Sequence, residues 1–411
     1  MVRRRGARAH VCIVVQNLPV PFDRRVWLEC LALREAGFEV SVVCPKGPGD
    51  PTYHVVEGVH LHKYRPFPPI TRQILFVAEY AWSILATFVG LLRVWRREPF
   101  RVVQLCNPPD VLWVAALPFK VLRRVKVVFD QHDLCPELYR SRFPAGTDAI
   151  HRLLLAAERL TYLVADRVVS TNESYRRKAL ERGRKKPAHV RVVRTGPDPT
   201  RMHRGPVDPA VRDGRQHLLA YLGVMGPQDG VDVALRAMHH IVHTRGRTDV
   251  ALVLIGDGDA APSLRKMARM LDLDSAVTFT GRIPDAEVRR ILSAADVGLS
   301  PDPRNPLNDV STMNKTMEYM AHELPVVAFD LVETRVSAQD AAVYARPNSP
   351  EDFGDAVLAL LDDEPRRKEM GLAGRARVED VLAWRCQVPA YVNLYRELIG
   401  TPAGGRDRAH V

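Results

Sequence analysis

Lys315 and Glu318 are the two residues of this sequence whose types and spacing suit ligand binding best. They stand three positions apart in the run NKTMEYMA, which has helical spacing and follows the loop 301–313. A cation in the first turn of a helix suits a phosphate, and a carboxylate can accept two hydrogen bonds from a vicinal diol such as that of ribose. The alternative interpretation is a surface helix that carries an i,i+3 Lys–Glu pair.

The residues just before this lysine extend the candidate site. Ser311, Thr312 and Asn314 join the loop to the expected helix. We expect Ser311 to cap the helix, which leaves backbone N–H groups of the first turn for a diphosphate. A phosphate-bearing ligand is therefore predicted at this helix start.

His132 is a second candidate, because it follows the apolar strand run Val125–Phe129. An imidazole there can donate a hydrogen bond to a phosphate or exchange a proton with a ligand. Asp133 is near enough in sequence to orient the ring, and Glu137 supplies a further carboxylate. The alternative is a turn and helix start in which Asp133 acts as the cap.

A third group follows the first strand and contains no glycine, so a glycine-rich phosphate loop is not expected there. Asp23, Arg24 and Arg25 are candidates for contacts to a phosphate or to a second substrate. A capping aspartate followed by two surface arginines is the competing interpretation. Arg140 and Arg142 are further candidates for an anionic substrate.

Short apolar runs alternate with helical patterns twice along the chain, which predicts two doubly wound α/β units. The proline- and glycine-rich stretch Thr195–Arg215 marks the join between them. Ligands of such sheets bind beyond the carboxyl ends of the strands, where the candidate residues stand. The expected strands are Val11–Val15, Val40–Cys44, Val102–Cys106, Val125–Phe129, Arg167–Ser170 and Val190–Val193, then Leu218–Leu222, Val250–Ile255, Val277–Thr280, Val297–Ser300, Val326–Phe329 and Ala342–Tyr344.

The charge of the chain is unevenly placed. Residues 1–205 hold 35 Lys and Arg against 18 Asp and Glu, or +17, and the remainder holds 24 against 30, or −6. A basic first half suits an anionic membrane surface or a phosphate-bearing lipid. Nucleic acid is the alternative partner, but we find no aromatic stacking residues or helix-turn-helix, so none is expected. The six cysteines form no C-x-x-C pair and indicate a reducing compartment, with no zinc or disulfide framework.

The stretch 74–92 is long and apolar, has one charge and is followed by three arginines within five residues. Strand-like segments that belong to the same domain precede it, which favours a packed or interfacial helix over a membrane span. The first nine residues carry four arginines, and the apolar run after them is too short for a signal peptide.

The run NKTMEYMAHELPVVAFD resembles the nucleotide-sugar helix and following strand of the family 4 retaining glycosyltransferases. The run from LVLIGDGD to AADVGLSP is also similar to their C-terminal domain. This resemblance implies the GT-B fold, in which two Rossmann-like domains face each other across a cleft. It implies a nucleotide diphosphate sugar donor, no metal or other cofactor, and retention at the anomeric carbon.

The resemblance also implies roles for single residues. Glu318 would hold the ribose hydroxyls, and the backbone at Arg282 and Ile283 would flank the base. Gly256 and Asp257 would form a turn at the floor of the donor site. The implied organisation is an acceptor domain at 1–200, a donor domain at 201–385, a helix at 386–399 that crosses back, and a disordered tail at 400–411.

The sequence departs from the usual family pattern at two places. Val310 stands where the family has a first glutamate, and Asp309 lies one position away. Val224 and Asp229 occupy the positions of the usual Arg and Lys, so we expect Lys315 and the start of its helix to meet the phosphate charge. This pattern resembles a subset of the family with an NKxxEYMA motif.

The function expected is therefore transfer of a sugar to an acceptor hydroxyl, in cell-envelope or exopolysaccharide synthesis. The acceptor is expected to be lipid-linked, and the enzyme to be peripheral on the inner face of the plasma membrane. The alternatives are a sugar-nucleotide epimerase on the same fold, or a binding protein without activity.

Overall fold

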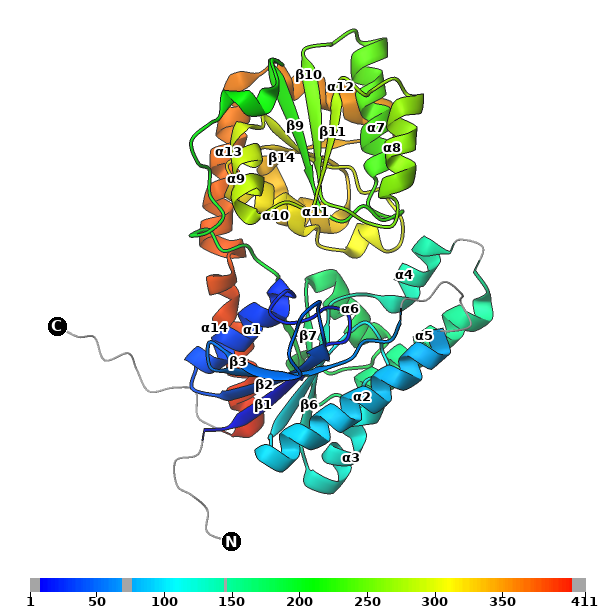
Figure 1. Cartoon of the computed structure of the whole chain (residues 1–411), viewed down its shortest axis with the longest axis vertical. Helices are drawn as coiled ribbons and strands as arrows, with labels where there is room; N and C mark the ends of the chain where they lie inside the picture. Colours follow the sequence, from blue (N-terminus) through cyan, green and yellow to red (C-terminus); the bar gives the residue numbers. More distant parts are fainter. Residues whose placement is uncertain (1–7, 69–75, 144–145, 401–411) are drawn as a thin grey trace, which may run out of the picture. The chain divides into compact units, whose positions relative to one another are not determined.

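The computed structural model describes residues 8–68, 76–143 and 146–400, with no side-chain detail at 76 and 77. The expected tail and the arginine-rich N-terminus, at 401–411 and 1–7, lie outside these residues. The chain divides into two compact α/β units (Figure 1). Residues 1–140, 145–194 and 387–411 form the first unit, and residues 141–144 and 195–386 form the second.

The first unit is built on one sheet of order β3-β4-β2-β1-β5-β6-β7-β8. Its strands are parallel except for β3, which pairs antiparallel with β4. Continuous apolar runs form the central strands because helices cover both faces of the sheet. The strands are β1 His10–Val14, β2 Glu39–Pro45, β3 Tyr53–Val56, β4 Val59–Tyr64, β5 Val102–Cys106, β6 Lys126–Gln131, β7 Arg167–Ser170 and β8 Val190–Val192.

The hairpin of β3 and β4 was not expected from the sequence. Its two-residue turn is Glu57-Gly58, and both residues have positive φ, 47° and 78°, as a hairpin turn of this length requires. The hairpin extends the sheet beyond β2 and provides its edge.

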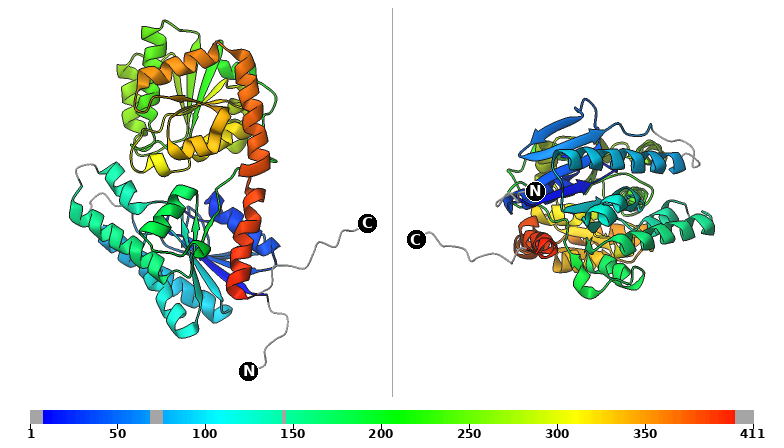
Figure 2. Two further views of the ribbon diagram at one scale, coloured as in Figure 1. Left: turned by 180° about the vertical axis from the view of Figure 1, so that it is seen from behind. Right: turned by 90° about the horizontal axis from the view of Figure 1, so that it is seen from below.

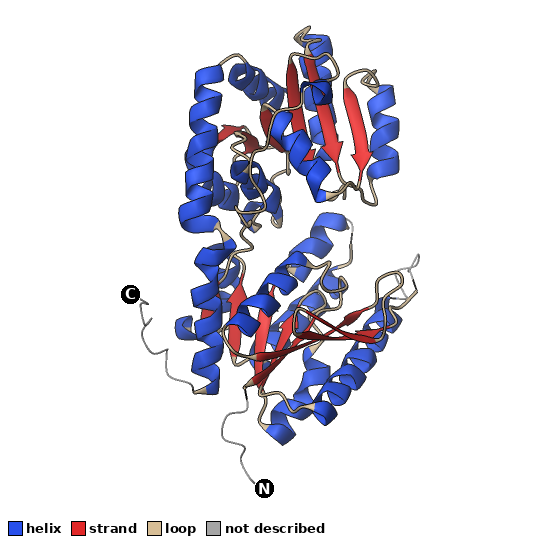
Figure 3. Cartoon of the chain, turned by 60° about the vertical axis from the view of Figure 1, so that its left-hand side comes forward, coloured by secondary structure: helices blue, strands red, loops and turns tan. Residues whose placement is uncertain are grey.

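The helices of the first unit cover both faces of this sheet (Figure 3). A ring cluster of Trp95, Phe100 and Phe119 packs α2 and α3 onto it. The last helix, α14, lies along the same unit from Gln387 onward (Figures 1 and 2), where Tyr391 donates a hydrogen bond to Gln104 at 2.7 Å. The helices are α1 Arg24–Glu35, α2 Phe76–Arg97, α3 Trp113–Arg123, α4 Cys135–Arg142, α5 Asp148–Val164, α6 Glu173–Glu181 and α14 Trp384–Ile399.

The second unit has a fully parallel sheet of order β11-β10-β9-β12-β13-β14. Separate buried apolar clusters lie on its two faces, which defines a doubly wound sheet. Its strands are β9 His217–Leu222, β10 Val250–Ile255, β11 Val277–Gly281, β12 Val297–Ser300, β13 Val326–Phe329 and β14 Ala342–Ala345. Its helices are α7 Val231–His239, α8 Ala261–Met270, α9 Asp285–Ala294, α10 Asn314–Ala321, α11 Val332–Ala338, α12 Pro350–Leu361 and α13 Glu364–Arg377.

The predicted fold class, two Rossmann-like α/β units, is confirmed. The apolar stretch at 74–92 falls largely within α2, and its first two residues lie outside the described ranges. Within the described part of the chain, no helix combines the length and the apolar character that crossing a bilayer requires.

Candidate functional site

The carboxyl edge of the second sheet is made of glycine turns that interlock. The N–H of Gly223 donates to Ile255, and that of Gly256 donates to Gly281, each at 3.0 Å. Gly256 has φ 129°, and a Cβ at that position would lie 1.9 Å from the carbonyl oxygen of Gly223. The ends of β9, β10 and β11 therefore meet with their backbones in contact.

We expect Gly256→Ala to lower the free energy of unfolding by about 2–4 kcal/mol, because its Cβ has no space and the backbone cannot yield. Gly246→Ala is the matched control, since Gly246 also has positive φ, 70°, but open space at its Cβ. The control should cost only about 1 kcal/mol. Urea unfolding of both variants measures the difference, and equal losses would contradict the close backbone contact.

Lys315 projects from α10 into this edge. Its Nζ lies 2.5 Å from Oδ1 of Asp302, which follows β12, and 5.1 Å from the ring centroid of Tyr221. Burial alone would lower the pKa of Lys315, but the carboxylates of Asp302 and Asp229 raise it. The ammonium is therefore retained at neutral pH at the predicted diphosphate site, with Asp302 as a partner that the sequence reading missed.

The predicted cap of this helix is wrong. The N-cap residue of α10 is Met313, with no side-chain cap, and Ser311 Oγ instead donates to the carbonyl of Leu307 at 2.8 Å. The short helical turn at 308–310 directs Ser311 back onto that turn. Thr312 and Asn314 flank the N-cap as expected, and Asn314 is exposed in the first turn.

Glu318 lies one turn further along α10 and is half-buried. Its backbone carbonyl accepts a hydrogen bond from Nδ1 of His322 at 2.8 Å. Tyr319 fixes the helix, because its hydroxyl accepts from the N–H of Leu222 at 2.7 Å and donates to the carbonyl of Leu299 at 3.1 Å. The helix is thereby held to β9 and β12, next to the glycine turns.

The remaining predicted donor residues lie at the same edge. Asp257 is exposed and accepts a hydrogen bond from the N–H of Gly258 at 2.9 Å. Arg282 is exposed just after β11, and Ile283 packs partly against the core. The Gly256–Gly281 hydrogen bond joins these two turns.

In the first unit, His132 follows β6 and pairs with Asp130. Its Nε2 lies 2.7 Å from Oδ2 of Asp130, so the expected orienting role of Asp133 is corrected to Asp130. Residues two apart in an extended chain point to the same face, which places these side chains together. Burial lowers the pKa of His132, but the Asp130 carboxylate outweighs it and raises that pKa above its ordinary value.

Arg25 is buried rather than exposed toward a substrate. Its guanidinium lies 2.8 Å from Asp130 and 3.1 Å from Glu29, and it donates to the carbonyl of Val193 at 3.0 Å. Burial lowers the pKa of Arg25, but Asp130 and Glu29 outweigh this effect and raise the pKa above its ordinary value. Arg25 therefore has a structural role in place of the predicted phosphate contact, since it binds the same Asp130 carboxylate that holds His132.

Asp23 and Arg24 were predicted either to contact a ligand or to be a helix cap and a surface arginine. Asp23 caps α1 by accepting from the N–H of Val26 at 3.1 Å, which agrees with the alternative interpretation. Arg24 is exposed at the start of α1, beside the carboxyl edge of the sheet.

Asn107 is a positioning residue that the sequence reading missed. Its Oδ1 accepts from the N–H of His132 at 2.7 Å and of Asp133 at 3.2 Å, and its Nδ2 donates to Asp110 at 2.9 Å. Asn107 is buried directly after β5, so its place at a strand end was the available indication. It holds the His132 loop from the neighbouring strand.

Four groups that can ligate metals, His132 among them, lie together in the first unit. Ligand atoms of Glu29, Cys106, Asp130 and His132 lie within 4.8 Å of one another. Arg25 already binds both carboxylates, so a cation would have to displace a buried guanidinium. The donor set therefore does not fit a divalent ion while Arg25 is in place.

Arg140 and Arg142 lie on α4 and are not members of this cluster. Arg140 donates to the carbonyl of Gly146 at 3.0 Å and pairs with Asp148. Arg142 is exposed at the end of the helix. Glu137 is not a second carboxylate beside His132, since it pairs with Arg182 at 2.9 Å.

Two α/β units of Rossmann type, each with polar side chains at the carboxyl edge of its sheet, define a GT-B protein. Residues 23–201 match the model described as "Glycosyltransferase Family 4", and residues 216–363 match "Glycosyl transferases group 1". The chain is thereby placed among the family 4 GT-B glycosyltransferases.

Curated relatives of the chain are named as sugar transferases. The chain is 26% identical over 247 residues to D-inositol 3-phosphate glycosyltransferase of Corynebacterium aurimucosum, covering 57% of each chain. It is 30% identical over 203 residues to a GDP-mannose-dependent alpha-(1-6)-phosphatidylinositol monomannoside mannosyltransferase of Mycobacterium tuberculosis, covering 48% of this chain and 51% of that one. The matches thus span only about half of these relatives.

Solved structures share the fold over nearly all of the chain. Sucrose-phosphate synthase from Thermosynechococcus elongatus has a TM-score of 0.76 and 18% identity, with 96% of this chain and 100% of that chain covered. Anabaena HepE in complex with UDP has a TM-score of 0.68 and 12% identity, with the same coverage. At such identity the likeness concerns the fold.

Proposed function

We propose that the chain is a retaining, metal-independent glycosyltransferase that moves a hexosyl group from a nucleotide diphosphate sugar to an acceptor hydroxyl. The observation that carries this proposal is α10, held against interlocked glycine turns with Lys315 and Glu318 on its first two turns. That combination suits a nucleoside diphosphate, because it offers a cation, a diol acceptor and close backbone approach. The family placement and the names of the relatives support it.

The proposed donor domain is 201–385 and the acceptor domain 1–200, with the helix at 386–399 returning to the latter. Glu318 binds the ribose hydroxyls, and the N-terminal turn of α10 with Lys315 receives the diphosphate. The backbone at Arg282 and Ile283 flanks the base, and the turn at Gly256 and Asp257 forms the floor of the donor site. Thr312, Asn314 and the departures at Val310 and Asp229 fit the proposed NKxxEYMA subset.

The proposed reaction is a displacement on one face of the sugar. The bond from the anomeric carbon to the diphosphate oxygen breaks while a bond to the acceptor oxygen forms on the same face. The acceptor proton passes to the departing diphosphate oxygen, so no side chain forms a covalent intermediate. His132, as an imidazolium held by Asp130, stabilises the charge that develops.

The proposed test of this role is a pH profile. Because the pKa of His132 is raised, its cationic form is lost only as the pH rises through that value, and kcat/KM should fall there. Asp130→Asn removes the group that raises the pKa, so the alkaline limb should move to lower pH. Asp133→Asn is the matched control and should leave the limb in place. If both variants shift it equally, Asp130 is not the orienting group.

The proposed acceptor is lipid-linked, and the proposed place of work is the inner face of the plasma membrane. Exposed apolar side chains on three helices of the first unit support this: Trp82, Leu85, Val121, Leu122, Leu153 and Leu163. Arginines flank them, including Arg152 and Arg159 on α5, as in an interfacial surface. The names of the relatives include phosphorylated and lipid acceptors.

Two experiments test the function. A thermal-shift panel of nucleotide sugars identifies the donor, because a ligand that binds the folded state raises the melting temperature. Incubation of that donor with and without polyprenyl-phosphate sugars then separates transfer from epimerisation, and the anomeric product defines the stereochemistry. Conversion of the donor without an acceptor would favour the epimerase. No binding and no conversion of any donor would contradict the proposal.

A further inference from the structure

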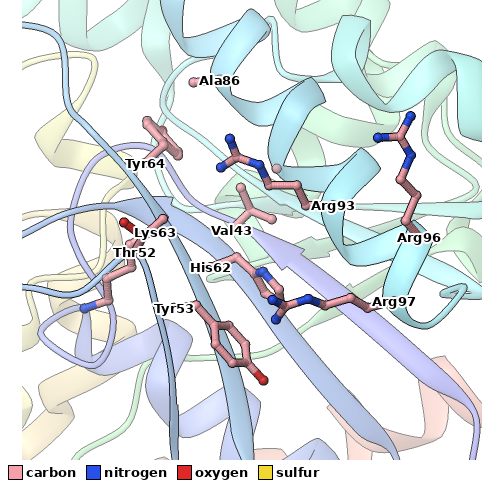
Figure 4. Close-up of a pocket in the computed structure, with 11 residues that line it drawn as sticks. Val43, Thr52, Tyr53, His62, Lys63, Tyr64, Ala86, Arg93, Arg96 and Arg97 are labelled. Carbon is pink, nitrogen blue, oxygen red and sulfur yellow. The ribbon is translucent and has the colours of Figure 1, made fainter.

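A cavity of about 450 Å³ lies in the first unit, between the edge of the sheet and the second half of α2 (Figure 4). This volume falls within the range of small-molecule sites, about 300–1,000 Å³. The strand order places β2 and β4, which form its floor, on the other side of β1 and β5 from β6 and His132. It is therefore distinct from the edge at which the reaction is proposed. Its lining is Val43, Thr52, Tyr53, His62, Lys63, Tyr64, Ala86, Gly90, Arg93, Arg96 and Arg97.

The helix side of this cavity is set by residues that share one face of α2. Ala86, Gly90, Arg93 and Arg97 follow each other at helical spacing. Gly90 lets the helix approach β2 closely, because a Cβ there would lie 2.5 Å from a methyl group of Val43. The close approach brings the arginine stems over the strands, and Figure 4 shows Arg93 and Arg97 extending across them.

The described residues that line the cavity carry positive charge and include no carboxylate. No carboxylate of the described residues forms an ion pair with Arg93, Arg96 or Arg97. Lys63 is different, because its Nζ is neutralised by Asp50 at 2.5 Å. The positive charge of these three exposed arginines is therefore not offset by a neighbouring carboxylate, which favours an anion.

The aromatic wall holds one of these arginines in place. The guanidinium carbon of Arg97 lies 4.3 Å from the ring centroid of Tyr53, whose hydroxyl bonds to Nδ1 of His60 at 2.8 Å. Burial, with further contributions from Arg97 and Arg93, lowers the pKa of the adjacent His62 to about 4. His62 is thus neutral at pH 7 and offers one donor and one acceptor rather than a further charge.

We propose that this cavity binds a phosphate or diphosphate group, held by Arg93 and Arg97 with Arg96 at the rim. Guanidinium groups bind phosphate oxygens in a bidentate manner, which suits paired arginines on one helix face. The phosphate belongs either to a soluble molecule or to a lipid headgroup, and the same chemistry serves both.

Arginine footprinting tests the site directly. Phenylglyoxal modifies exposed arginines, and mass spectrometry of peptides reports each position separately from any diphosphate bound elsewhere. Millimolar pyrophosphate, or vesicles of phosphatidylcholine with phosphatidylglycerol, should slow modification of Arg93 and Arg97 by about tenfold or more. Arg265 and Arg366 are exposed internal controls and should react unchanged.

The two ligands separate the sources of the phosphate. Protection by pyrophosphate supports a soluble ligand, and protection by the anionic vesicles alone supports a headgroup. No protection by either overturns the site, even where sugar transfer is observed. Conversely, protection in a protein that binds no nucleotide sugar would leave this site standing and the proposed function refuted.

Substitution gives an independent measurement. The double variant Arg93→Gln/Arg97→Gln should weaken binding of the protecting ligand by about tenfold or more, since two charge-assisted contacts are lost. Arg265→Gln/Arg366→Gln removes the same charge, and Arg265 stacks on Phe279 at 4.6 Å much as Arg97 stacks on Tyr53. If both double variants weaken ligand binding equally, the effect comes from net charge and the proposed site is overturned.

Discussion

Glu318→Ala should lower kcat/KM by about 100- to 10,000-fold with the nucleotide sugar that the protein binds. A carboxylate that accepts two hydroxyl hydrogen bonds contributes about 1.5–3 kcal/mol for each, and both are lost in alanine. The substitution should leave the fold intact, because alanine favours helices and α10 is held by Tyr319 and Lys315 on other faces. Steady-state kinetics measures the effect.

A donor analogue makes this prediction specific to the ribose. A 2′-deoxy nucleotide sugar lacks one of the two hydroxyls, so it should be a poor donor for the native enzyme but no poorer than the parent for Glu318→Ala. Such non-additivity identifies two groups in contact. Glu369→Ala, an exposed glutamate of α13, is the control and should change neither donor. Additive losses would mean that Glu318 acts without touching the ribose.

The strands that carry these sites could be predicted from the sequence, because a buried strand requires a continuous run of apolar residues. Continuous apolar runs such as Val102–Cys106 and Val326–Phe329 appear as strands with the predicted bounds. The hairpin was missed because β4 reads VHLHKY, and the burial of its polar residues depends on distant partners. Lys63 is buried against Asp50, and Arg97 stacks on Tyr53 of the adjoining strand. The periodicity of the sequence does not predict such pairs.

The candidate sites show the same division between local and distant information. The predicted strand ends indicated that His132, Gly256 and Lys315 lie at carboxyl edges, where parallel α/β sheets bind ligands. Their partners were not predictable in this way. Asp302 lies 13 residues before Lys315, and Arg25 reaches Asp130 across 105 residues. Sequence reading therefore finds the edge of a sheet more readily than the charges that compensate one another within it.

Arg25→Met should lower the free energy of unfolding by about 3–5 kcal/mol, because the buried carboxylate of Asp130 loses its guanidinium partner and keeps only His132. Asp130 and Glu29 are both buried against its guanidinium, and Gln104 donates to each, at 3.0 and 2.7 Å. Methionine fills most of the arginine's volume, so the loss reports charge more than packing. Arg24→Met, at the exposed neighbouring position, is the matched control and should cost little.

The pH dependence of this loss separates charge from packing. Burial raises the pKa of Asp130, but Arg25 and His132 outweigh it and hold that pKa well below its ordinary value. The stability that this carboxylate contributes is therefore present above its unfolded pKa of about 3.9. Without Arg25 the folded pKa of Asp130 rises, and the ionised form becomes costly as the pH increases. The penalty should therefore be larger at pH 8 than at pH 5, and adding Glu29→Gln should recover part of it. A penalty that is constant with pH would assign the role of Arg25 to packing and remove the electrostatic account of how His132 is held.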